Sequence, residues 1–177
     1  MKKLLTIIVG VIIMSGCTDA NGEATQLTPA QQAEVKAIAV IAKFEGFRSY
    51  WYSCSAGVRT IGYGFTKATL TEDEMKIASM DRKTADRILG REVRKIQKQV
   101  AGLVTRKMTV NQEVAVISFV YNFGITKFKN STLLKRINDG SANDVVVGEF
   151  KRWVYGGGIR LGGLVTRRER EANLWIS

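Results

Sequence analysis

Residues Glu45 to Gly64, EGFRSYWYSCSAGVRTIGYG, decide the fold of this 177-residue chain. A carboxylate at the end of an apolar helical stretch runs directly into alternating aromatic and polar residues. Gly57 lies within this run and predicts the turn between two short antiparallel strands. A ribbon of this size is marginally stable unless it packs on helices. The stretch therefore predicts an α+β fold.

A helix is expected to lead into the ribbon, over about residues 29 to 45. Residues 28–31, Thr-Pro-Ala-Gln, supply an N-cap, a proline at the first helical position and the glutamine that closes a capping box. These three features together place the helix start at this point of the chain.

Glu45 follows an apolar stripe along that helix. Val35, Ile38 and Ala42 recur at helical spacing and predict the buried face, and Glu45 is the next member. The helix dipole disfavours a negative charge in the last turn, and burial against neighbouring phenylalanines would disfavour it further. Both effects would raise the pKa of the carboxyl, as a general acid requires. The alternative is a solvated charge at a helix end.

The spacing after Glu45 is specific. Nine residues lead to Cys54, six more to Thr60, and then comes Ile61-Gly62-Tyr63-Gly64. This pattern resembles the active-site signature of the phage-type lysozymes, glycoside hydrolase family 24, in its lambdoid branch. The resemblance implies a lysozyme-like fold: a small antiparallel ribbon lobe and a larger helical lobe joined by a long helix.

The resemblance also implies catalytic roles. Glu45 would be the general acid, Cys54 would stand where the family usually has Asp at the opposite face of the sugar, and Thr60 would orient the water. An unperturbed thiol, with a pKa near ~8.5, is only a few per cent ionised at pH 7. The sequence therefore leaves open whether Cys54 acts as a thiolate or through its polarity.

Matches to the family extend over roughly residues 30 to 176, with one departure. Where the family usually has Gly-Tyr-Gly-His-Thr, residues 62–66 read Gly-Tyr-Gly-Phe-Thr, and the chain contains no His. A mechanism that relies on imidazole is thereby excluded.

Five residues are candidates for substrate contact. Tyr63 and Phe65 are aromatic residues that stack on sugar rings or pack within the lobe, while Tyr121, Asn122 and Ser131 fall where the family lines its cleft. The implied substrate is peptidoglycan, cut at the β-1,4 bond between N-acetylmuramic acid and N-acetylglucosamine during host lysis by a phage or prophage. No cofactor and no metal are expected.

From residue 70 onward the sequence predicts helices and no further strand. Capping boxes begin helices at Thr71 and Thr109, and a long amphipathic helix is expected over about 81 to 103. Near the end of the chain, residues 167–171, Arg-Arg-Glu-Arg-Glu, are most simply a solvated helix face with internal ion pairs. The prediction is one catalytic domain over 23–177, with the ribbon lobe at about 46–68 and the helical lobe at about 81–177.

The net charge of +11, from 27 basic and 16 acidic residues, calls for an anionic partner. Nucleic acid, anionic lipid and the bacterial wall all qualify. The basic residues are scattered along the helices with no basic arm or reading motif, which argues against nucleic acid. We expect a monomer that binds peptidoglycan glycan strands.

Residues 1–22 are expected to be an export signal or membrane anchor. Lys2 and Lys3 precede an apolar run, Leu4 to Met14, of the length of a signal-peptide core. The residues before Cys17 resemble a lipoprotein processing site, whereas the family resemblance favours a signal-anchor, and plain cleavage is a third alternative. Each predicts export to the periplasm, with or without a tether to the inner or outer membrane.

Cys17 and Cys54 are the two cysteines of the chain. In an oxidising compartment they could pair, which would block the sulfur of Cys54 until the bond is reduced or exchanged. If Cys17 is lipidated, this pairing does not form.

An alternative function belongs to a different class. A membrane-anchored lipoprotein of lysozyme fold could bind the wall with weak or no turnover, as the replacement by Cys54 and the motif at Cys17 suggest. The sequence also leaves open whether cleavage inverts or retains the configuration at the sugar carbon. It does not distinguish host lysis from remodelling of a cell's own wall.

Overall fold

The computed structural model describes residues 26–54 and 57–177, so Cys17 and the predicted export segment lie outside the described residues. The helices and strands follow in this order: α1 Pro29–Glu45, β1 Arg48–Ser53, β2 Arg59–Gly62, α2 Glu72–Met75, α3 Arg82–Ala101, α4 Val110–Phe123, α5 Ile125–Lys129, α6 Thr132–Asn138, α7 Asn143–Lys151, β3 Tyr155–Gly156, β4 Ile159–Arg160 and α8 Gly162–Ile176.

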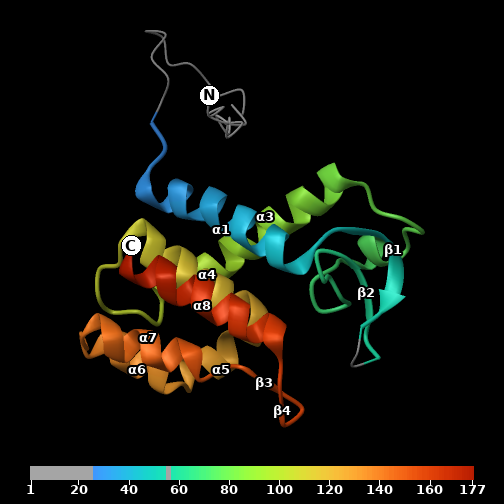
Figure 1. Ribbon diagram of the computed structural model, residues 1–177. Helices are drawn as coiled ribbons and strands as arrows, with labels where there is room; N and C mark the ends of the chain where they lie inside the picture. The colour runs from blue at the N-terminus through green and yellow to red at the C-terminus, as the bar shows by residue number, and fades with distance from the viewer. Residues whose placement is uncertain (1–25, 55–56) are drawn as a thin grey trace, which may run out of the picture.

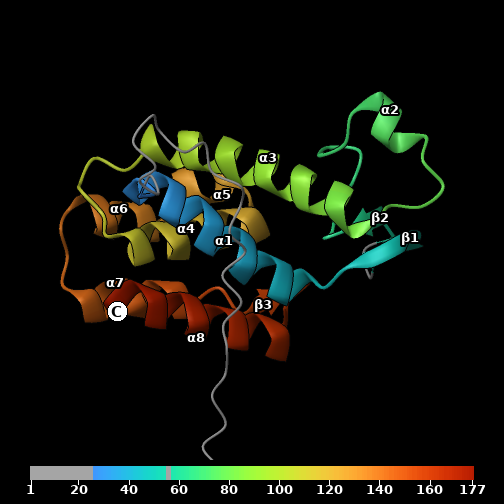
Figure 2. The same ribbon diagram turned by 90° about the horizontal axis from the view of Figure 1, so that it is seen from above.

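The arrangement is α+β, as predicted. Figures 1 and 2 show the ribbon β1–β2 with α2 at one end of the molecule and the remaining helices gathered into a second body, with α3 running from the first to the second. We call these parts the ribbon lobe and the helical lobe. The long helix expected over about 81 to 103 is α3, and its predicted apolar side is buried: Ala85, Ile88, Leu89, Val93, Ile96 and Val100.

The ribbon forms where the sequence predicted it. β1 and β2 are antiparallel, with Tyr52 opposite Thr60 and Ser53 opposite Arg59. Gly57 has a φ of +74°, a conformation that glycine adopts without strain. The predicted turn residue therefore reverses the chain between the two strands.

The buried face of α1 differs from the predicted one. Val35 is 56% exposed, and the helix instead buries Ala33, Ala37 and Ile41. These residues follow one another at steps of four, and this face of α1 packs against α4, with two small alanine side chains in the stripe. Glu45 is the next residue at that step, so it still continues the buried stripe.

Helix α4, which is rich in Val, Ile and Phe, is the centre of the helical lobe. Every residue from 114 to 120 is buried, and α4 contacts α1, α3 and α8. Phe119 lies within ring-contact distance of Phe128, Phe150 and Trp153, with centroids 5.2 to 6.1 Å apart. This core fixes the helices that carry the site.

Other boundaries and one pair of strands were predicted wrongly. β3 and β4 form a hairpin where the sequence predicted helices and no further strand. The capping box at Thr71 predicts a helix to about Ala78, but α2 ends at Met75. Ser141 with Asp144 predicts a capped helix start, but α7 begins at Asn143 with no side-chain cap. The strands of the hairpin have two residues each, which is too short for an alternating pattern.

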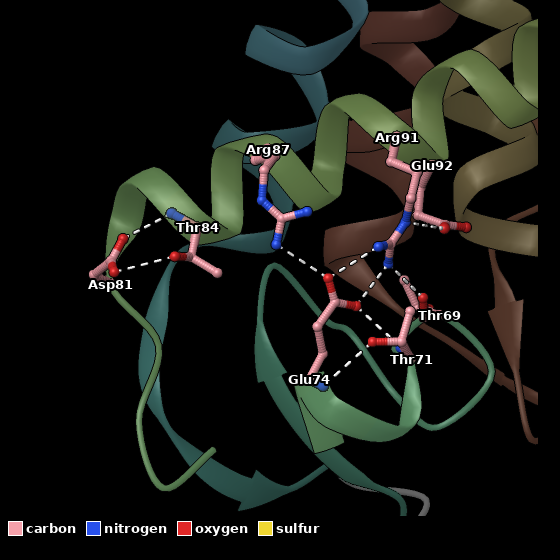
Figure 3. Close-up of polar contacts among 8 residues, drawn as sticks. All are labelled: Thr69, Thr71, Glu74, Asp81, Thr84, Arg87, Arg91 and Glu92. Carbon is pink, nitrogen blue, oxygen red and sulfur yellow. Dashed lines mark hydrogen bonds and ion pairs between the residues drawn. The ribbon is translucent and has the colours of Figure 1, made fainter. Parts of the chain in front are cut away.

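An ion-pair network fastens α2 to α3 (Figure 3). Glu74 closes the capping box of Thr71 and accepts hydrogen bonds from Arg91, at 2.9 Å to each carboxylate oxygen, and from Arg87 at 3.1 Å. Arg91 also donates to the carbonyl of Thr69. The pairing with Arg91 is the main reason that the pKa of Glu74 falls to about 2. The network holds the ribbon lobe against the long helix.

Replacing Glu74 with Gln should remove part of the acid sensitivity of the fold. The pKa of Glu74 is about 2 in the folded protein against 4.5 without these partners, so its stabilisation is present above about pH 4.5 and is lost as pH falls toward 2. The free energy of unfolding is measured with urea at about pH 5 and pH 2. Between these two pH values it should fall by about 1–2 kcal/mol more in the wild type than in Glu74→Gln, a figure that allows for solvent screening of the ion pairs.

The matched control is Asp73→Asn, because the Asp73 side chain is 93% exposed in its pair with Lys76. Its unfolding free energy should follow that of the wild type across the same pH range. If the wild type and Glu74→Gln lost the same free energy of unfolding on acidification, the role given to this network would be contradicted.

Candidate active site

Glu45 is the last residue of α1, and its carboxylate is held from two sides. Oε1 accepts a hydrogen bond from Nη1 of Arg167 at 2.6 Å, and the side chain is 22% exposed. On the other side lies Gly64 of the ribbon lobe, whose φ is +84°. It is so close that a side chain added there would place its Cβ 3.4 Å from Oε2. The glycine therefore allows the ribbon lobe to pass close to this carboxylate.

Arg167, from α8, reaches three elements with one guanidinium group. Besides Glu45 of α1, it donates to the carbonyl of Ser118 in α4 at 3.1 Å and to Glu171 at 3.3 Å. Its guanidinium carbon lies 5.1 Å from the ring centre of Phe44. With 5% of its side chain exposed, Arg167 fixes the position of Glu45 relative to the helical lobe.

The interpretation of residues 167–171 as a solvated face was wrong. Arg167, Arg168 and Glu171 are all buried, and Glu171 accepts hydrogen bonds from Ser118 Oγ at 2.7 Å and from Arg168 at 2.8 Å. Burial raises the pKa of Glu171 and lowers the pKa of Arg168 to about 10, each against the opposing effect of its ion-pair partner. The sequence did contain a signal for this burial, because one face of the helix carries two charged residues together with two apolar ones: Arg168, Glu171, Ala172 and Trp175.

Cys54 and Thr60 meet at one backbone carbonyl of the ribbon. The carbonyl of Val58 accepts the backbone N–H of Cys54 at 3.0 Å and the hydroxyl of Thr60 at 2.8 Å. Cys54 is partly buried next to the turn, and Thr60 is buried in β2. The ribbon thus brings the two predicted residues together.

Tyr121 joins the ribbon lobe to α4. Its hydroxyl donates a hydrogen bond to the carbonyl of Tyr63 at 2.8 Å. Burial raises the pKa of Tyr121, and the negative charge of Glu45 raises it further. Tyr121 therefore belongs to the immediate surroundings of Glu45, and its phenol stays protonated at neutral pH.

A pocket of about 260 Å³ lies beside Tyr121 and Gly64. Its lining residues are Gly64, Thr69, Glu92, Lys95, Ile96, Gln99, Val120, Tyr121, Gly124 and Ile125. The pocket therefore holds both acidic and basic groups, and Gly64 is the lining residue that also lies beside Glu45.

The remaining predicted contact residues differ in exposure. Phe65 is fully buried, Tyr63 is 2% exposed and the hydroxyl of Ser131 caps α6 by accepting the N–H of Leu134. These side chains support the walls of the site and offer little surface for a sugar. Asn122 is exposed near the C-terminal end of α4.

Within the described ranges 26–54 and 57–177, no group of three or more Cys, Asp or Glu side chains is placed to hold a metal ion. The side chains of the arrangement offer a carboxyl group at Glu45, a hydroxyl at Thr60 and a sulfur at Cys54. A carboxyl group and a hydroxyl group suit proton transfer to a leaving oxygen and activation of water.

Comparison with known proteins gives the family. A family model described as phage lysozyme matches residues 42–171, which include Glu45, Cys54, Thr60 and Arg167. The chain belongs to the phage lysozyme family. Its activity class is that of a lysozyme-type glycoside hydrolase that degrades peptidoglycan.

Relatives of known sequence and structure agree with this assignment. The chain is 32% identical to an endolysin of Acyrthosiphon pisum secondary endosymbiont phage 1, covering 80% of this chain and 96% of that protein. It is 33% identical to a SAR-endolysin of bacteriophage PS119, with 74% and 77% covered. The endolysin from Escherichia coli O157:H7 phage FAHEc1 superposes with a TM-score of 0.72 at 28% identity, over 88% of this chain and 96% of that one.

The variant Arg167→Met should destabilise the phage lysozyme fold strongly. Removing the cation leaves Glu45 and Glu171 without its hydrogen bonds in a buried setting, where breaking an ion pair from one side costs about 3–5 kcal/mol. Urea unfolding at neutral pH measures the change.

Arg170→Met is the matched control because Arg170 is exposed on the same helix, and its effect should stay within ~0.5 kcal/mol. A loss for Arg167→Met no larger than that of the control would show that the buried pair contributes little to stability.

Proposed function

We propose that this lysozyme cleaves the β-1,4 bond between N-acetylmuramic acid and N-acetylglucosamine in peptidoglycan, with Glu45, Cys54 and Thr60 as catalytic residues. The observation that carries the proposal is the placement of Glu45 between a buried arginine and the ribbon lobe. The same lobe brings Cys54 and Thr60 to one carbonyl. The catalytic domain spans residues 23–177 and acts as a monomer.

Glu45 serves as the general acid. Arg167 occupies Oε1, so Oε2 is the oxygen left to carry the proton to the departing sugar. Oε2 also lies on the side of Gly64, where the ribbon lobe passes. The fixed carboxylate orientation saves the cost of ordering the acid during the reaction.

Thr60 and Cys54 act on the opposite face of the sugar. The hydroxyl hydrogen of Thr60 is donated to Val58, which leaves Oγ1 to accept a hydrogen from water. Cys54, partly buried beside it, is the nearby group that accepts the proton or stabilises developing positive charge. Tyr121 and Asn122 contact the glycan from the helical lobe.

The enzyme acts in the periplasm and serves host lysis by a phage or prophage. Export is supported by the basic start and apolar run of residues 1–22 and by the similarity to SAR-endolysins. Among the described residues, no helix has the length and apolar character needed to cross a bilayer. The N-terminal segment is lipidated at Cys17, retained as a signal-anchor or cleaved; where Cys17 is kept and not lipidated, it is the candidate partner of Cys54 in a regulatory disulfide. Mass spectrometry of the exported protein distinguishes an acylated Cys17 from a crosslinked peptide.

The variant Glu45→Gln should abolish glycan cleavage because glutamine has no proton to donate. Release of reducing ends from purified peptidoglycan should fall by roughly 10²–10⁴-fold, the size of a general-acid contribution. Glu34→Gln is the matched control: Glu34 lies on the same helix, in a pair with Arg94 at 2.6 Å, and its loss should leave turnover near wild type. Turnover by Glu45→Gln comparable to wild type would refute the proposed acid.

The role of Cys54 is tested by replacing its sulfur. Cys54→Asp supplies a group that is ionised at pH 7 and should retain glycan cleavage, whereas Cys54→Ala should lower it by roughly 10–10³-fold. The assay is the release of reducing ends, with dithiothreitol present in all samples. Full activity of Cys54→Ala in reductant would remove Cys54 from the chemistry.

A further inference from the structure

The hairpin β3–β4 presents an aromatic and cationic face to solvent. Tyr155 is 59% exposed and lies directly opposite Arg160 in the strand pairing. Residues directly opposite each other in an antiparallel pair project to the same face, so the side chains of Tyr155 and Arg160 extend from one face of the hairpin. Gly156 and Ile159 occupy the other face, where Ile159 is 68% exposed.

The hairpin has a defined shape. Gly157 and Gly158 have φ values of +58° and +81°, the pair of positive angles that a two-residue type I′ turn requires. The N–H of Leu161 donates to the carbonyl of Val154 at 2.9 Å. A Cβ placed at Gly156 would lie 2.7 Å from the Leu161 side chain, so that side chain covers the strand. The face with Tyr155 is therefore held in place.

The hairpin lies at the same end of the molecule as Glu45. It leads directly into α8, where Arg167 comes five positions after Gly162, a rise of roughly 7.5 Å along the helix. Arg167 is the residue that binds Glu45. In Figure 1 the hairpin hangs from the N-terminal end of α8, which is the end of that helix nearer to the ribbon β1–β2.

We propose that the face formed by Tyr155 and Arg160 is a subsite for the peptidoglycan strand beyond the sugars at the cleaved bond. The ring of Tyr155 stacks on an N-acetyl sugar, and Arg160 pairs with a carboxylate of the peptide stem. This inference rests on the proposed function and names the part of the substrate that this hairpin binds.

Chemistry favours this occupant. Peptidoglycan presents apolar C–H faces of sugar rings and carboxylates along one strand, which an adjacent phenol and guanidinium match. A half-exposed tyrosine ring contributes little to folding, because most of its apolar area stays in water. The net charge of +11 also attracts the anionic wall.

Binding of the full-length chain to purified peptidoglycan sacculi, measured by sedimentation in a Glu45→Gln background, tests the subsite without cleavage. Adding Tyr155→Ala should weaken Kd by roughly 3–10-fold, the loss of one ring contact. Adding Arg160→Ala should weaken Kd by roughly 2–5-fold at low salt, and this difference should shrink at high salt. Ile159→Ala, on the opposite face of the same hairpin, is the matched control and should stay within about 1.5-fold of its parent.

Unchanged binding for both Tyr155→Ala and Arg160→Ala would overturn the subsite, and so would an equal loss for Ile159→Ala. A loss of self-association by Tyr155→Ala in sedimentation velocity, with binding unchanged, would assign the face to a second copy and likewise overturn it. Cleavage by the Glu45→Gln parent would refute the proposed function instead, and a parallel reducing-end assay reports it separately.

Discussion

The buried guanidinium of Arg167 is the constraint on which the site depends. Its planar group donates to a carboxylate of α1, a carbonyl of α4 and a carboxylate of its own helix. Taking such a cation out of water is costly unless all of its donors find good partners. The three helices are therefore held in one relative arrangement, and Glu45 takes its position from the packing of the helical lobe.

The features that the sequence predicted well are local. Capping boxes at Thr28, Thr71 and Thr109 depend on side chains three residues apart, and all three form as expected. The buried side of α3 followed from a strong 3.6-residue period. On α1 the same reasoning chose the wrong stripe, because it followed the more apolar Val35, whereas the face that packs against α4 carries the less apolar Ala33 and Ala37. Hydrophobicity alone does not report how near two helices come.

The features that escaped prediction depend on long-range pairing or on very short elements. Glu45 and Arg167 are 122 residues apart in the chain, so their ion pair had no local signal. The replacement of the usual histidine by Phe65 was visible in the sequence, whereas its burial in the ribbon lobe was not. Cys54 and Thr60 could be proposed as catalytic residues because their spacing along the chain resembles that of a known family. The buried residues that position Glu45 come from distant helices and had no such pattern.

The site also depends on how firmly the two lobes are joined. Tyr121 of α4 binds the carbonyl of Tyr63, and the next residue, Gly64, passes beside Oε2 of Glu45. The phenol of Tyr63 accepts from Arg82 and donates to Asp86, both on α3. One loop of the ribbon lobe is therefore attached to α3 and α4 where it meets the carboxylate. Arg167 attaches Glu45 to the helical lobe, and this loop attaches the ribbon to the same body. Glu45 and the strand carrying Thr60 are therefore held in a fixed position relative to each other.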